Sequence, residues 1–229
     1  MKKKLATTMA ITTLVTSVGT IGEVNANEKE YVNIKESIVA EKEDNTTKVQ
    51  IGEIFVTLEY NEDDIIIERK ATKNNIYEIH IIDKDTNKLL ESYTEEIIKI
   101  NKNTSHHFIN KHRYDGPIKT TLETVVDLYS SGSFRQINSI VGCKIFASSS
   151  SATTLQDKSA RATSATGVFP TTKINMSGSG VITGTATKNL GVNFSIEALK
   201  SAGFTITNQQ STTWNYRKPV SMSYSYSLY

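Results

Sequence analysis

The chain has 229 residues and a formal net charge of +2, and 22% of its residues are charged. This near-neutral balance, with its basic residues spread thinly, argues against nucleic acid as a partner. The single cysteine, Cys143, excludes an intramolecular disulfide, and we expect it to be a small buried hydrophobic residue. Stability therefore has to come from packing and hydrogen bonding.

Residues 1–26 have the pattern of a secretory signal peptide. Three lysines at positions 2–4 precede an apolar run from about Leu5 to Val18, and small residues lead to a cleavage position near Ala26. Threonines dilute the apolar run, which is too short for a membrane span of about 20 apolar residues. We therefore expect the mature chain to be extracellular.

Acidic and basic side chains are unevenly divided between the two halves of the mature chain. Residues 27–103 contain 18 acidic and 11 basic residues, a net charge of −7, and residues 104–229 contain 5 and 12, a net charge of +7. Oppositely charged regions can dock on each other, and a basic half can bind anionic polymers or lipid headgroups. The alternative is that solvated faces merely differ in composition.

The first half predicts a small acidic domain. Residues 27–46 are charged and poor in large apolar groups, which predicts a disordered acidic leader. Residues 47–103 then contain four β-branched and aromatic runs separated by polar turns, at 48–60, 65–69, 76–82 and 89–94. Strands that follow one another in this way predict an antiparallel β-meander.

Residues 104–116 read as a linker, because Asn, Lys and His accumulate there and a Gly-Pro pair follows. Beyond it, residues 117–229 predict a basic, Ser/Thr-rich, β-sandwich-like domain. Residues 118–129 indicate a strand, while 134–146 fit either a strand or a short helix. The Ser/Thr-rich stretch 147–187 fits either a linker or strands with hydroxyls on the exposed face, and strands are favoured for its later part.

The last part of the chain contains a helix and a regular strand. Residues 193–203 predict a helix with Ser195 as its N-cap and Gly203 as its end. The final ten residues alternate strictly, with Val220, Met222, Tyr224, Tyr226 and Leu228 on one face and serines between them. The predicted fold class is thus mainly β: a small antiparallel meander followed by a β-sandwich-like domain with one short helix.

The densest aromatic and basic cluster is Trp214, Tyr216, Arg217 and Lys218. Such rings beside cations could stack on sugars or sit at a membrane interface, although we favour a core position for Trp214 itself. We take these four residues as the candidate contact site.

Other residues that could carry chemistry give weaker signals. His106, His107 and His112 are close in sequence, but neighbouring residues of an extended chain point to opposite faces, so we expect no metal site. No serine lies in a Gly-x-Ser-x-Gly elbow and no phosphate-binding glycine loop is present. We therefore expect no catalytic residues, no cofactor and no enzyme activity.

The chain as a whole resembles the small secreted β-rich proteins of Gram-positive bacteria that carry no assigned activity. The resemblance lies in the Lys-, Asn- and Ile-rich usage and the three-lysine head, and it transfers no functional residues.

We expect a secreted, non-enzymatic, extracellular or cell-surface-associated binding protein. Its expected partner is an anionic cell-wall polymer or a membrane surface, and its ligand and oligomeric state stay open. The alternative is a secreted toxin or bacteriocin-like, β-pore-forming protein in which the acidic region masks the basic half. In that case residues 147–187 would supply an amphipathic membrane hairpin. A secreted hydrolase ranks third.

Overall fold

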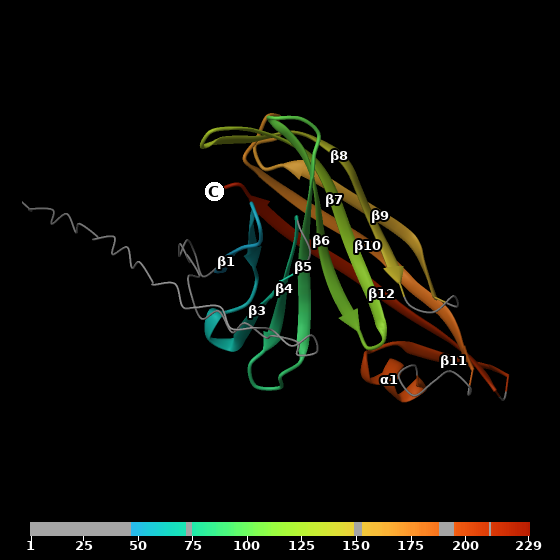
Figure 1. Cartoon of the computed structure of the whole chain (residues 1–229). Helices are drawn as coiled ribbons and strands as arrows, with labels where there is room; N and C mark the ends of the chain where they lie inside the picture. The colour runs from blue at the N-terminus through green and yellow to red at the C-terminus, as the bar shows by residue number, and fades with distance from the viewer. Residues whose placement is uncertain (1–46, 72–74, 149–152, 188–194, 211) are drawn as a thin grey trace, which may run out of the picture. The chain divides into compact units, whose positions relative to one another are not determined.

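The computed structural model describes residues 47–71, 75–148, 153–187, 195–210 and 212–229. These residues form a mainly β structure of antiparallel sheets with one short α-helix, as predicted (Figure 1). The signal peptide and acidic leader expected in residues 1–46 lie outside the described residues. None of the helical segments in the described part is long and apolar enough to cross a membrane.

Six consecutive strands form a meander in which each strand pairs antiparallel with the next. The strands lengthen along the chain, from 7 residues in the first to 15 in the last. Their bounds are β3 (Ile65–Ala71), β4 (Ile76–Asp83), β5 (Leu89–Lys99), β6 (Thr104–Asp115), β7 (Ile118–Ser131) and β8 (Phe134–Ser148). The predicted meander is confirmed, but it continues far beyond residue 103.

The other sheet joins the two ends of the described chain. A short hairpin of β1 and β2 pairs through β2 with the end of β12, while β10 pairs with β12 along its whole length. β9 flanks β10, and β11 pairs with the start of β12. The bounds are β1 (Thr47–Gln50), β2 (Phe55–Leu58), β9 (Thr153–Ser164), β10 (Lys173–Thr187), β11 (Thr205–Gln210) and β12 (Thr213–Ser227). A short 3-10 turn, η1 (Glu62–Asp64), leads from β2 into the meander.

The two sheets pack on a shared hydrophobic core and come together where β8 lies beside β9 (Figure 1). The alternation of the C-terminal strand is confirmed, because its apolar residues are buried and the serines between them are exposed or half-buried. Fully burying one such side chain contributes roughly 1.5–3 kcal/mol. The buried residues of this face are Val220, Met222, Tyr224, Tyr226 and Leu228.

A second, smaller core lies under helix α1 (Ile196–Ser201). The predicted cap is confirmed, since the Ser195 hydroxyl accepts a hydrogen bond from the Ala198 N–H at 3.1 Å. The turn between β6 and β7 touches this helix. Gly116 has a φ of +59°, and a Cβ there would lie 3.0 Å from the Cβ of Ala202, so the turn requires glycine.

The predicted division into two domains needs correction. Residues 104–115, expected as a linker, form β6, which pairs with β5 on one side and β7 on the other. The hairpin of residues 47–58 also belongs to the sheet formed by the C-terminal part. Strands from both predicted domains therefore share one core. The segment 134–146, for which the sequence fitted either a strand or a short helix, is strand, and 153–187 is mostly strand rather than linker.

Candidate functional site

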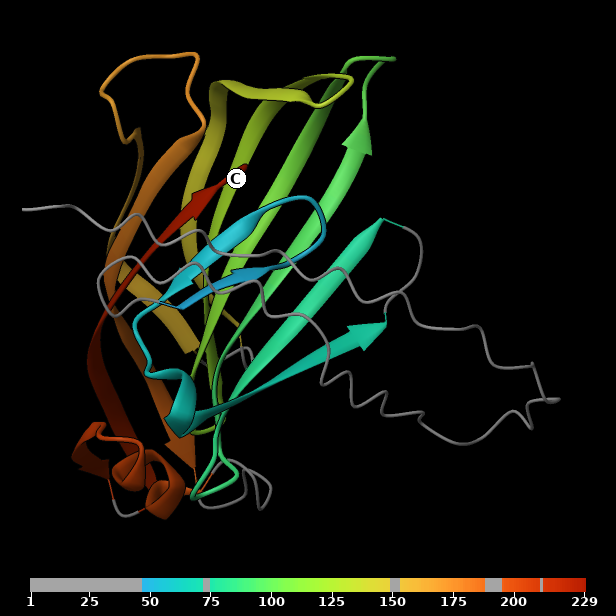
Figure 2. The same ribbon diagram turned by 90° about the vertical axis from the view of Figure 1, so that its left-hand side faces the viewer.

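Three turns lie side by side along one end of the sheets (Figure 2), and the C-terminal Tyr229 contacts the middle turn at Arg135. We call this region the loop end; it consists of residues 99–103, 130–136, 165–173 and 228–229. Hydrogen bonds link its segments to one another. They are Ser130 N–H to the Asn103 carbonyl at 2.8 Å, Arg135 N–H to the Tyr229 hydroxyl at 2.9 Å, and Leu228 N–H to the Thr172 carbonyl at 3.0 Å.

Large apolar side chains are exposed at each segment of the loop end. Exposed hydrophobic residues scattered singly are normal, but a group of them at one end marks a contact surface. Their exposed fractions are 54% for Ile100, 54% for Phe134, 64% for Val168, 40% for Phe169 and 55% for Tyr229.

The charges at the loop end are mainly positive. Lys99, Lys102 and Lys173 are exposed, and none of them makes an ion pair with a described residue. Arg135 is held in place, since its guanidinium donates to the carbonyls of Glu53 at 2.7 Å and Leu228 at 2.5 Å. An apolar surface with free cations around it suits an anionic partner.

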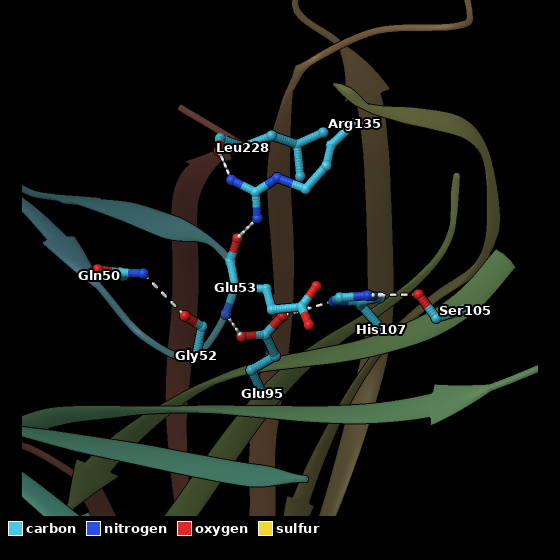
Figure 3. A network of polar contacts seen from close by, with 8 residues as sticks. All are labelled: Gln50, Gly52, Glu53, Glu95, Ser105, His107, Arg135 and Leu228. Carbon is cyan, nitrogen blue, oxygen red and sulfur yellow. Dashed lines mark hydrogen bonds and ion pairs between the residues drawn. The ribbon is translucent and has the colours of Figure 1, made fainter. Parts of the chain in front are cut away.

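A buried polar network begins directly behind the loop end (Figure 3). The His107 imidazole and the Glu95 carboxylate are both fully buried, and Nδ1 lies 2.6 Å from Oε1. The other carboxylate oxygen of Glu95 accepts a hydrogen bond from the Glu53 N–H at 2.8 Å. The Ser105 hydroxyl lies 2.9 Å from Nε2 of the same imidazole. Every polar atom of the buried pair thus has a partner, as burial requires.

Strand geometry explains why these groups meet. Ser105 and His107 are two residues apart on β6 and so share its inner face, while Glu95 lies on the neighbouring strand β5. The start of β6 is fixed by Asn101, whose side-chain oxygen accepts hydrogen bonds from the N–H groups of Asn103 and Thr104, each at 2.9 Å.

The network opens into a cavity of about 420 Å³ at the loop end. Ser105 and Ser130 lie in its wall together with Lys99, Lys102 and Arg135. The cavity therefore presents a hydroxyl backed by a buried imidazole and carboxylate, surrounded by positive charge. The expectation from sequence missed Ser105 and Glu95 altogether. The serine and histidine spaced two apart in Ser105-His-His107 gave the only signal, and it is a weak one.

Comparisons with known proteins add no relative. No protein-family model matches the chain, no curated protein is significantly similar to it, and no solved structure matches it.

The four residues predicted as a contact site do not form one surface. Tyr216 is buried in the second core, where its hydroxyl lies 2.6 Å from that of Thr153, and Trp214 is half-buried. Arg217 is exposed on the opposite face of β12. Lys218 Nζ lies 2.5 Å from a carboxylate oxygen of Asp115.

That ion pair lines a second hollow, of about 770 Å³, between β6, β12 and the helix α1. The cations that β6 and β12 contribute are paired with carboxylates. Lys111 binds Glu91 at 2.8 Å, and Arg113 binds Asp115 at 3.1 Å. The hollow is thus less suited to capturing an anion than the loop end.

The three clustered histidines do not converge. His107 is buried inside, whereas His106 lies on the other face of β6, 3.9 Å from Asp127. His112 hydrogen-bonds to the Thr121 hydroxyl at 2.9 Å, and burial together with the Lys119 charge lowers its pKa to about 4. Within the described residues no three metal-binding side chains are grouped.

Cys143 packs partly buried against the core, and burial raises the pKa of its thiol.

Proposed function

We propose that this chain is a secreted protein that binds an anionic lipid membrane surface through the loop end. The observation that carries the proposal is the grouping of exposed Ile100, Phe134, Val168, Phe169 and Tyr229 on adjacent turns. Apolar and aromatic side chains of this kind partition into the boundary between headgroups and acyl chains.

Charge favours a membrane over an uncharged partner. Lys99, Lys102 and Lys173 lie beside the apolar side chains, where their long stems allow the ammonium groups to reach phosphate headgroups. Each basic residue near an anionic surface contributes about 1 kcal/mol to binding. The N-terminal sequence pattern, typical of a secretory signal, supports a location where such a surface is met from outside.

The test is sedimentation of the mature chain with vesicles of phosphatidylglycerol and phosphatidylcholine. The doubly substituted Val168→Ser, Phe169→Ser chain should bind at least about 10-fold more weakly, because each buried apolar side chain contributes roughly 1.5–3 kcal/mol. Binding should also weaken with added salt, since exposed charges are screened.

Val141→Ser is the matched control, because Val141 is as exposed as the loop-end residues, at 55%, but lies in the middle of β8. It should leave vesicle binding unchanged. If the wild-type chain fails to sediment with either kind of vesicle, or if Val141→Ser weakens binding as much as the double substitution, the proposal is wrong.

The second candidate function is a β-pore-forming toxin, favoured by the pattern of β9 and β10. These strands contain 12 and 15 residues, and about 9–11 residues suffice for a strand that crosses a membrane. Along β10, buried Ile174, Met176 and Ile182 alternate with exposed polar residues, and the exposed Val168 and Phe169 lie in the turn between the two strands. A hairpin of this kind could leave the sandwich and insert.

Dye release from vesicles tests this candidate. Ile137 and Thr171 exchange backbone hydrogen bonds of 2.8 and 3.0 Å, so a cysteine pair at these positions, with Cys143→Ser, can tie the turn to β8. A toxin should release dye when this pair is reduced and not when it is oxidised. Absence of release from the wild-type chain, or equal release from both forms, rejects this candidate.

A further inference from the structure

We propose that Ser105 is the nucleophile of an ester-hydrolysing site in which His107 is the general base and Glu95 is a positioning residue. This inference goes beyond membrane binding and does not depend on it. It also departs from the expectation that the chain has no catalytic residues, because the groups involved are brought together by the pairing of strands and not by a sequence motif.

The hydrogen bonds fix the direction of proton transfer. An ionised Glu95 carboxylate can only accept, so His107 Nδ1, 2.6 Å away, has to carry the proton. In a neutral imidazole Nε2 is then the acceptor, and it lies 2.9 Å from the Ser105 hydroxyl. The hydroxyl therefore donates to Nε2, which is the connectivity of a nucleophile, a base and a carboxylate that orients the base.

The base is held rigidly. Both His107 and Glu95 are fully buried, and the Glu53 N–H anchors the second carboxylate oxygen at 2.8 Å. The Glu53 carbonyl is in turn held by Arg135 at 2.7 Å. A site needs supporting contacts of this kind, because small displacements of the base are costly to catalysis.

The cavity at the loop end gives a substrate access to the serine. Its volume of about 420 Å³ is in the range of small-molecule sites, and Ser105 forms part of its wall. Lys99 and Lys102 line the same cavity and make no ion pair with a described residue. Their charge favours a carboxylic ester that carries an anionic group, and it stabilises negative charge developing on the carbonyl oxygen.

The reaction proceeds in two balanced steps. Ser105 Oγ forms a bond to the ester carbonyl carbon while its proton passes to His107 Nε2. The carbon–oxygen bond of the leaving alcohol then breaks, and the alcohol takes that proton, which leaves an acyl-serine. In the second step a water molecule gives a proton to Nε2 and attacks the acyl carbon. The carboxylic acid leaves, and the proton returns to the serine oxygen.

The test is covalent labelling of the mature chain by a soluble fluorophosphonate, without lipid, followed by mass spectrometry of the peptides. We expect one adduct per chain, at Ser105, and none in Ser105→Ala. Ser139→Ala is the matched control, because Ser139 is an exposed serine of β8 that does not line the cavity; it should label as the wild type does.

Glu95→Gln separates catalysis from structure. The amide keeps the shape of the side chain but no longer fixes the proton on Nδ1, so the labelling rate should fall at least about 100-fold in a chain that circular dichroism shows to be folded. A wild-type chain that forms no adduct at Ser105, or labelling of Ser105→Ala equal to that of the wild type, overturns the proposal. Because no lipid is used, either result leaves membrane binding to be judged by its own test.

Discussion

Burial of the His112 imidazole makes the stability of the fold depend on pH. Its pKa falls from the usual 6.5 to about 4, first because of burial and second because of the Lys119 charge. Between these values the unfolded chain takes up a proton that the folded chain does not, so the free energy of unfolding decreases as pH falls from about 6.5 towards 4. The largest contribution of this residue is about 3 kcal/mol.

Urea unfolding at pH 7 and pH 4.5 measures this effect. In His112→Gln the difference in unfolding free energy between the two pH values should be smaller than in the wild type by about 1–3 kcal/mol. An equal difference in both chains would show that His112 does not carry this part of the pH dependence.

Two neighbouring tyrosines of β12 should respond in opposite ways to loss of the hydroxyl. Tyr224 donates to the Ile109 carbonyl at 3.0 Å, whereas the buried Tyr226 hydroxyl has no hydrogen-bond partner among the described residues. Burial raises the pKa of both. Tyr224→Phe should lower the free energy of unfolding by about 1–2 kcal/mol, because it removes a buried hydrogen bond.

Tyr226→Phe is the matched variant and should be neutral or slightly stabilising, because it removes a buried hydroxyl that makes no hydrogen bond with a described residue. Urea denaturation of both variants is the measurement. Equal destabilisation of the two, or a larger loss for Tyr226→Phe, would contradict the arrangement described for this strand.

Close packing between β10 and the meander depends on glycine. A Cβ on Gly178 would lie 2.8 Å from Leu122 Cδ1 and 3.1 Å from Ile145 Cδ1, so the sheets could not approach as they do. Gly178→Ala should therefore lower the free energy of unfolding by about 1–3 kcal/mol.

Gly142→Ala, on β8, is the control. A Cβ at Gly142 would meet no atom within 4 Å. The substitution should therefore leave the free energy of unfolding unchanged or raise it slightly. Thermal unfolding compares the two variants. If Gly178→Ala unfolds at the same temperature as the wild type, β10 does not pack on β7 and β8 as described.

Two strands show what the sequence could and could not predict. In β12 every second residue is apolar and buried, so period-two alternation identified both the strand and its buried face. β6 was mistaken for a linker because several inward residues are polar. His107 and Lys111 face Glu95 and Glu91 on β5, and these pairings replace apolar contacts. A strand whose inner face is ion-paired has no apolar alternation to detect.

The same pairings explain why the described residues of the predicted meander and of the predicted C-terminal domain pack around one core. The acidic meander strand β5 and the basic-half strand β6 are neighbours, so the opposite net charges of the halves meet in part as ion pairs between adjacent strands. The candidate sites were missed for a related reason. Ser105 and Glu95 become neighbours only through strand pairing, and the loop end joins turns that are far apart in sequence.

The orientation of the whole molecule on a membrane follows from where its two ends lie. The single tryptophan, Trp214, is near the start of β12, and Tyr229 follows the end of the same strand, roughly 50 Å away in extended chain. If the loop end alone enters the headgroup region, Trp214 stays outside the bilayer. The fluorescence of Trp214 therefore reports on the end of the molecule that lies away from the loop end.

The most direct test is quenching of tryptophan fluorescence by brominated lipid in vesicles containing phosphatidylglycerol. Phe169→Trp in a Trp214→Phe background places the fluorophore at the loop end, and the wild-type chain keeps it at Trp214. We predict strong quenching of the tryptophan at position 169 and none of Trp214. Quenching of Trp214, or its absence at position 169 in vesicle-bound protein, would contradict docking through the loop end.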